Sequence, residues 1–220
     1  MIIEGPAGIG KTALLDVVNT MAKDDGVRAL GASGGELEVD FPFGVVRQLF
    51  APFLTDTADQ SPLLAGAASM ARPVLLMADS TDPSQPAGGG GLFESLDGLY
   101  RLTSSIAQSS PLMFTIDDAH WCDGASLRYL IYLRRRLVEL PIAIVVATCP
   151  GEPSGNARLI DQLRVQGNTD VLDLEGLSLR LSVRCFAAPS AKPHTLSSPR
   201  PRTQPQVAIR SLSASWPPLS

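Results

Sequence analysis

Short apolar runs alternate with segments of helical periodicity over the first 175 residues. The continuous runs predict buried parallel strands, and we place strands at 1–4, 27–31, 112–116, 142–147 and 171–174. Apolar positions at helical spacing predict helices at 12–18, 41–54, 63–77, 92–108, 127–137 and 156–165. Strands alternating with helices predict an α/β fold in which a mostly parallel sheet has helices on both faces.

Helix ends carry further signals. Pro52 is expected near the end of the second predicted helix, and Pro73 is expected to interrupt the third, because proline removes a backbone donor. Asp123 is placed to cap the amino terminus of the helix that follows it.

Two segments lack periodicity. Residues 79–91 contain prolines and four consecutive glycines, which predicts a mobile surface linker inside a core at 1–177. Residues 178–220 hold many serines, no acidic residue and seven prolines between Pro189 and Pro218, which predicts a disordered tail. The sharp change in composition also suggests an artificially ended reading frame.

Composition limits the remaining possibilities. With 220 residues, 45% of them hydrophobic, the chain can bury one core, and no apolar run or leader pattern indicates a membrane span or signal peptide. Three widely spaced cysteines suit reduced thiols in a cytosol. His120 and Cys122 lack a second ligand pair, so a metal site there is not favoured. Residues 1–175 carry a net charge of 12 − 22 = −10, which does not support nucleic-acid binding by the core.

The strongest motif is a glycine-rich loop between the first predicted strand and helix. It fits the phosphate-binding pattern G-x-x-x-x-G-K-[ST] at every fixed position, with the residues Gly5, Pro6, Ala7, Gly8, Ile9, Gly10, Lys11 and Thr12. In this pattern backbone N–H groups and the helix amino terminus face phosphate oxygens. Lys11 is expected to reach the β- and γ-phosphates of ATP, and the Thr12 hydroxyl to ligate Mg²⁺.

A second motif follows about a hundred residues later. The apolar run 112–116 ends in Asp117 and Asp118, which predicts two carboxylates at the carboxyl end of a buried strand. In phosphate-loop enzymes one such carboxylate holds Mg²⁺ and another orients the attacking water. We assign Asp117 to the metal and Asp118 to the water.

Three separated blocks, 2–15, 41–50 and 116–127, together resemble one family. It is the AAA-like ATPase domain of the large ATP-binding LuxR-type transcriptional regulators, which belong to the STAND branch of P-loop NTPases. The resemblance covers about residues 1–177 and implies a three-layer P-loop fold. It also implies an ATP-dependent switch that controls assembly and binds DNA through a distant helix-turn-helix.

The chain departs from that family in four places. Cys149 stands where the family usually has an arginine, which weakens the expectation of hydrolysis more than that of binding, because a thiol supplies no positive charge. The strand before Gly5 is short, which suggests a clipped amino terminus. No helical lid is recognisable after Leu177, and no helix-turn-helix is recognisable, so DNA binding by this chain is not expected.

The sequence therefore predicts Mg-ATP binding with slow hydrolysis by a cytoplasmic switch core. A non-hydrolysing module that self-associates with ATP, a nonfunctional truncated fragment and a small-molecule kinase stay open as alternatives.

Overall fold

The computed structural model describes residues 1–54, 62–76, 91–137, 140–152, 154–165 and 169–175. The linker predicted at 79–91 lies outside these residues except for Gly91, and so does the tail predicted at 178–220. None of the helices in the described ranges is long and apolar enough to cross a membrane.

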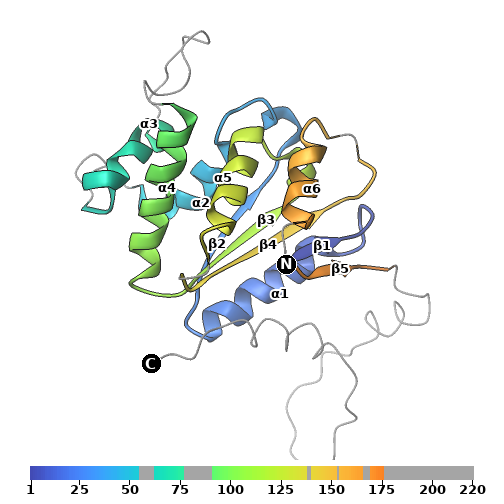
Figure 1. Ribbon diagram of the computed structural model, residues 1–220. Helices are drawn as coiled ribbons and strands as arrows, with labels where there is room; N and C mark the ends of the chain where they lie inside the picture. The colour runs from blue at the N-terminus through green and yellow to red at the C-terminus, as the bar shows by residue number, and fades with distance from the viewer. Residues whose placement is uncertain (55–61, 77–90, 138–139, 153, 166–168, 176–220) are drawn as a thin grey trace, which may run out of the picture. The chain divides into compact units, whose positions relative to one another are not determined.

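Five parallel strands form one sheet in the order β2-β3-β4-β1-β5 (Figure 1). The strands are β1 (Ile2–Glu4), β2 (Arg28–Ser33), β3 (Leu112–Asp117), β4 (Ile142–Thr148) and β5 (Val171–Asp173). β3 is buried along five of its six residues, as its continuous apolar sequence predicts. All five carboxyl ends meet at one edge of the sheet because the strands are parallel.

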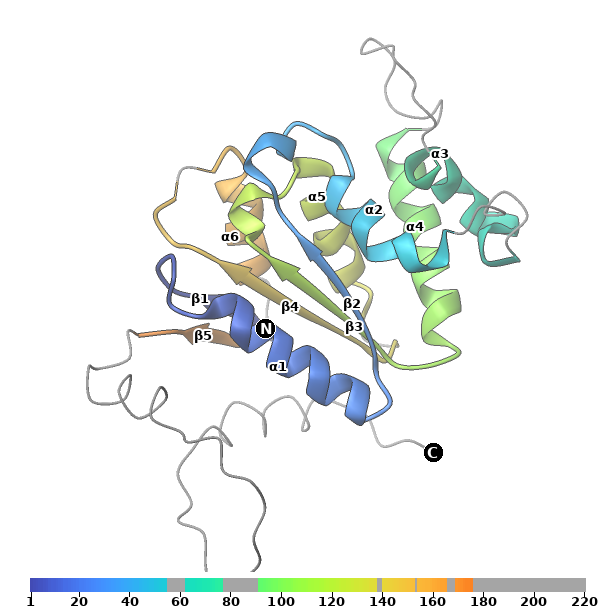
Figure 2. The ribbon, with the colours of Figure 1, turned by 180° about the vertical axis from the view of Figure 1, so that it is seen from behind.

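Helices connect the strands. The α-helices are α1 (Lys11–Asp24), α2 (Gly44–Phe50), α3 (Arg72–Leu75), α4 (Leu92–Ala107), α5 (Gly124–Arg134) and α6 (Ala157–Val165). Short 3₁₀ turns lie at η1 (Glu36–Glu38), η2 (Ala51–Phe53), η4 (Pro62–Leu64), η5 (Gly66–Ala71) and η6 (Ala119–Trp121). Figures 1 and 2 show α1 on one face of the sheet and α2, α5 and α6 on the other, with α4 packed outside α2 and α5. The described residues thus form a three-layer α/β fold.

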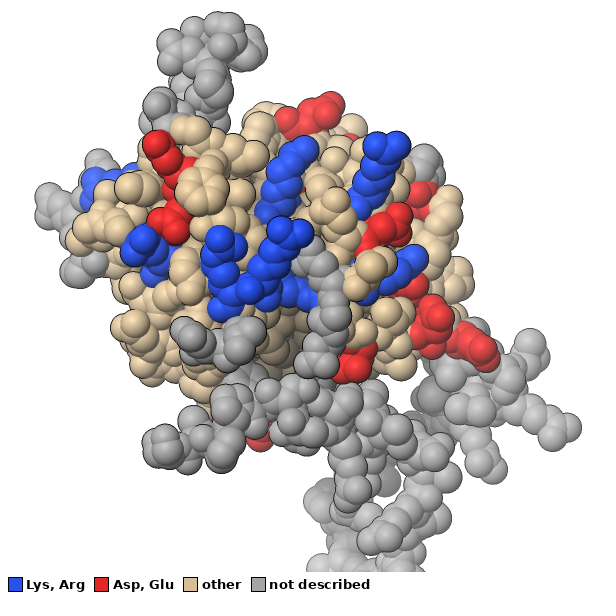
Figure 3. All heavy atoms as spheres, in the orientation of Figure 1, with Lys and Arg blue, Asp and Glu red and all other residues tan. Residues whose placement is uncertain are grey.

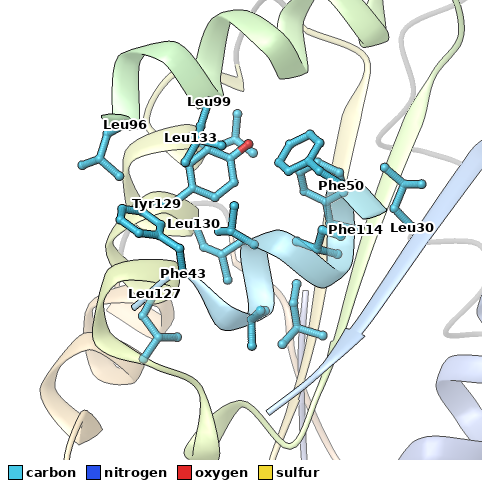
Figure 4. Packing of buried hydrophobic residues seen from close by; sticks show 14 of the residues in the cluster. Leu30, Phe43, Phe50, Leu96, Leu99, Phe114, Leu127, Tyr129, Leu130 and Leu133 are labelled. Atoms are coloured by element: carbon cyan, nitrogen blue, oxygen red, sulfur yellow. The ribbon is translucent and has the colours of Figure 1, made fainter. Parts of the chain in front are cut away.

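The main core lies between the sheet and α2, α4 and α5 (Figure 4). Phe50 of α2 packs edge-on against Phe114 of β3 and Tyr129 of α5, with ring centroids 6.0 and 6.3 Å apart. Tyr129 is fully buried, and its hydroxyl is hydrogen-bonded to that of Thr103 on α4. These contacts join α2 to the sheet and to α5, and they join α5 to the outer helix α4.

The α4, α5 and α6 predictions are confirmed to within a few residues, but two other helices differ from expectation. The segment predicted as a helix at 41–54 begins only at Gly44, after Phe43 adopts a left-handed conformation with φ 61°, and it ends in the 3₁₀ turn η2. The segment at 63–77 is mostly 3₁₀, and Pro73 lies in the first turn of α3 rather than interrupting a helix. Proline is tolerated there because first-turn N–H groups have no helical partner.

The negative charge of the body is unevenly distributed. Seven of the twelve cationic residues before position 176 fall between 101 and 164, the segment that contains α5 and α6 and the end of α4. Figure 3 shows lysine and arginine side chains gathered on the face where these helices lie. The acidic groups predominate elsewhere.

Candidate functional site

The glycine-rich loop connects β1 to α1 at the carboxyl edge of the sheet. Gly8 and Gly10 have φ values of 75° and 105°, which favour glycine, and a Cβ atom at either position would meet nothing within 4 Å. Gly5 serves a different purpose, because a Cβ there would lie 3.0 Å from Ile9 and 3.1 Å from Leu174, just after β5. The first glycine therefore permits close packing, and the other two shape an open loop.

The Lys11 side chain is hydrogen-bonded to the backbone of the loop. It is only 6% exposed, and its Nζ donates to the backbone oxygens of Gly5 and Pro6 at 2.9 and 3.0 Å. An ammonium group has three donors, so these carbonyls use two of them and one is left for a ligand. Pro6, Ala7 and Gly8 are exposed, which leaves the outer side of the loop open to solvent.

The structure brings the two predicted motifs together. Thr12, in the first turn of α1, donates its hydroxyl proton to Asp117 Oδ2 at the end of β3, over 2.6 Å. Asp117 Oδ1 accepts the N–H of Asp118 at 2.9 Å. Behind this contact, Thr115 of β3 donates to the Asn19 side chain of α1 at 3.1 Å, which fixes the helix against the strand.

These groups fit the ligands that the motifs predict. Hard oxygen ligands of the kind that Mg²⁺ prefers, the Thr12 hydroxyl and the Asp117 carboxylate, are adjacent at the mouth of the loop. Next to them, the open loop with its two left-handed glycines can accommodate phosphate oxygens. Within the described ranges no group of three or more His, Cys, Asp or Glu side chains could hold a metal ion on its own.

Asp118 starts a sharp turn away from the strand. Its φ of 45° and ψ of 47° place it in the left-handed region, which aspartate tolerates better than most residues. The Asp118 side chain is half-buried at this turn. The turn η6 follows directly and leads to Asp123.

Asp123 has a larger role than its predicted one. Its Oδ1 accepts the N–H of Ser126 at 2.8 Å, which confirms the cap of α5. The same carboxylate also accepts the N–H groups of Phe43, at 2.8 Å, and Val45, at 3.3 Å, at the start of α2. One buried carboxylate therefore caps two helices, and no sequence signal in 41–45 indicates this second contact.

Cys149 follows the carboxyl end of β4. It is 8% exposed, and its backbone N–H donates to Nδ1 of the buried His120 at 3.4 Å. This contact links the end of β4 to the turn after Asp118.

Cys122 is fully buried beside the site. Burial raises the pKa of its thiol well above the ordinary value, and the carboxylates of Asp123 and Asp118 raise it further. The thiol is therefore protonated and unreactive at neutral pH.

Three further contributions to the site were not predicted from the sequence. Glu4, the last residue of β1, is buried and forms an ion pair with Arg164 of α6, which anchors the strand before the loop. Gln48 of α2 binds the backbone of Ser33 at the end of β2. A Cβ on Gly34 would lie 2.4 Å from the Asp118 carbonyl oxygen, so only glycine fits this close approach.

Comparison with known proteins gives one family match. Residues 1–146 match the model of the AAA ATPase domain. No curated protein matches the chain.

Several solved structures are similar in fold. Cdc6p from Pyrobaculum aerophilum has a TM-score of 0.45 at 16% identity and covers 79% of this chain and 38% of its own. AMPPCP-bound DnaA from Aquifex aeolicus has a TM-score of 0.40 at 14% identity, over 80% and 40% of the two chains. Drosophila ORC bound to DNA has a TM-score of 0.44 at 15% identity, over 84% and 40%. The chain thus spans 38–40% of the length of these solved chains.

Proposed function

The chain belongs to the AAA ATPase domain family, and from that premise we propose that it binds Mg-ATP in the loop between β1 and α1. The observation that carries this proposal is the 2.6 Å contact between Thr12 and Asp117. Two motifs 105 residues apart in the sequence meet there, as a shared Mg²⁺ site requires.

Each residue of the site has a defined role in this proposal. The loop amides and the third N–H of Lys11 donate to phosphate oxygens, while Thr12 and Asp117 hold Mg²⁺. When bound, Mg²⁺ supplies positive charge that offsets the negative charge on the phosphates. The Asp118 carboxylate orients a water for attack on the γ-phosphate, which gives slow hydrolysis.

Binding of a fluorescent ATP analogue tests the proposal directly. Lys11→Ala is expected to abolish binding, whereas Lys23→Ala, an exposed lysine at the other end of α1, serves as the matched control. Equal affinity of wild type and Lys11→Ala would refute the proposed site.

A thermal melt gives an independent readout. Mg-ATP at about a hundred times its dissociation constant adds roughly 2.7 kcal/mol of stability. Since each kcal/mol is worth about 2–4 °C for a domain of this size, the midpoint should rise by roughly 5–10 °C. The rise should be absent in Lys11→Ala.

A finer proposal concerns biological context. The resemblance of 2–15, 41–50 and 116–127 to the LuxR-type regulators supports a role as the nucleotide switch of such a regulator. Light scattering with and without Mg-ATP tests it, because a switch that controls assembly should change mass with nucleotide. A monomer under both conditions argues against it.

Cys149 favours a second candidate, a module that binds ATP without hydrolysing it. The position near the turn after Asp118 offers a thiol in place of a guanidinium, so no positive charge from this position reaches the γ-phosphate. Phosphate release from wild type and Asp118→Asn distinguishes the two candidates. Release by wild type alone supports hydrolysis, and equal background release from both proteins supports the non-hydrolysing module.

A further inference from the structure

At the end of β2, the backbone groups on the edge without a neighbouring strand are hydrogen-bonded to a side chain. β2 is an edge strand of the sheet, so alternate backbone groups face away from β3. At Ser33 those groups are paired with Gln48 of α2. The Ser33 N–H donates to Gln48 Oε1 at 3.0 Å, and Gln48 Nε2 donates to the Ser33 carbonyl at 3.1 Å.

The two hydrogen bonds between Ser33 and Gln48 lie beside Asp117, the proposed Mg²⁺ ligand. Ser33 is in register with Asp117 on β3, and the next N–H, that of Gly34, donates to the Asp117 carbonyl at 3.0 Å. Gly34 also packs so closely on the turn after Asp117 that a Cβ would lie 2.8 Å from the backbone of Trp121 and of Cys122. A shift of Ser33 and Gly34 must therefore displace the segment that carries Asp117.

The other end of α2 is fixed by the same segment. Asp123 accepts the N–H groups of Phe43 and Val45, and Ser126 Oγ accepts the N–H of Val46 at 3.1 Å. The contacts thus form a closed circuit, from Asp117 through η6 to Asp123, along α2 to Gln48, and back through the end of β2.

We propose that Gln48 is a positioning residue for the Mg²⁺ ligand Asp117, acting through Ser33 and Gly34. The proposal rests on the assignment of Asp117 to Mg²⁺ in the proposed function. Because the circuit includes α2 and the loop at 34–43, binding of Mg-nucleotide and the position of α2 are coupled, and by linkage each biases the other.

Hydrogen exchange without nucleotide tests the circuit itself. In Gln48→Ala the amides of Gly34, Asp118, Trp121 and Cys122 should exchange about three- to tenfold faster than in wild type. Gln162→Ala is the matched control, since Gln162 is an exposed glutamine on α6, outside the circuit. Faster exchange at Gly34 with unchanged exchange at 118–122 would overturn the proposal. Gln48 would then only pair the backbone groups at the edge of β2, without an effect on the position of Asp117.

A magnesium titration tests the consequence for the site. Partners of metal ligands typically change metal affinity 10- to 100-fold when removed. Gln48 acts one step further away, so the Mg²⁺ concentration for half-maximal binding of the ATP analogue should rise about three- to tenfold. Analogue affinity in EDTA and the melting temperature should stay near wild type. An unchanged Mg²⁺ requirement would refute the positioning role.

Gln48→Glu separates the two hydrogen bonds. Glutamate keeps an acceptor for the Ser33 N–H but places a second oxygen against the Ser33 carbonyl, so it should behave like alanine or worse. If wild type fails to bind the analogue in a Lys11-dependent manner, the proposed function fails, while the exchange experiment still decides the circuit.

Discussion

Replacing Asp123 with alanine removes the shared cap of α2 and α5. The carboxylate is 2% exposed and accepts three backbone N–H groups, from Phe43, Val45 and Ser126. Alanine leaves all three donors without that acceptor. Asparagine is the informative companion, because its single oxygen can retain the two 2.8 Å bonds while its amide nitrogen faces the Val45 N–H.

The magnitudes follow from those contacts. Each buried donor left unsatisfied costs about 1–3 kcal/mol, so three donors suggest roughly 3–9 kcal/mol for Asp123→Ala. Asp123→Asn loses the longest bond and the charge, and should cost about 1–2 kcal/mol. The alanine variant therefore loses a large share of a stability that is typically about 5–15 kcal/mol.

Urea unfolding followed by far-ultraviolet circular dichroism measures both variants. Asp16→Asn, an exposed acid on α1, is the control and should stay within about 0.5 kcal/mol of wild type. The reasoning is refuted if Asp123→Ala costs less than about 1 kcal/mol, or if asparagine costs as much as alanine. The second result would mean that charge, not the number of accepted bonds, holds the two helices.

Three further predictions concern the core and its titration. Tyr129→Phe should cost about 1 kcal/mol in urea unfolding, because Thr103 already donates its own proton to a backbone carbonyl and loses only the donor of Tyr129. Burial raises the pKa of Cys122, so the folded chain keeps a proton that the unfolded chain releases above about pH 8.5. The free energy of unfolding should therefore fall by up to about 1.4 kcal/mol per pH unit from this group, and Cys122→Ala should flatten the alkaline slope measured between pH 8 and 10. Gly98→Ala should destabilise by about 1–3 kcal/mol despite the better helix propensity of alanine, because its Cβ would lie 2.5 Å from the Ala71 nitrogen; a higher melting temperature would contradict this.

The sheet and most of its helices could be predicted from the sequence. Continuous apolar runs identify β3 and β4, since a strand buried on both faces has no polar side to alternate with. The segments at 41–54 and 63–77 were harder, because their apolar positions satisfy helical periodicity while Phe43 and Pro73 set the real boundaries. Tertiary packing under α4 decides those conformations, and no local pattern reports it.

The places of the glycine-rich loop, between β1 and α1, and of Asp117, at the end of β3, could also be predicted, because fixed residue types recur there at fixed spacing. The contact between Thr12 and Asp117 brings those predicted residues together. Gln48 and the second role of Asp123 were not predictable, because glutamine on an exposed helix face and aspartate before a helix are common in any protein. Only the three-dimensional path of the chain shows that both residues lie on the same circuit around Asp117.

The place of β1 in the sheet determines when the site can form during synthesis. Its two neighbours are β4 and β5, so Ile2 is opposite Val146 and Val171, which are 144 and 169 residues later in the chain. At about 5–20 residues per second, the ribosome produces β5 on the order of 10 s after β1. β2 and β3 can pair before β1 gains its first partner, β4, and the other edge of β1 stays unpaired until β5 is made. The glycine-rich loop after β1 is thus synthesised well before both strands that flank β1 in the sheet, and its surroundings are complete only once β5 has been added.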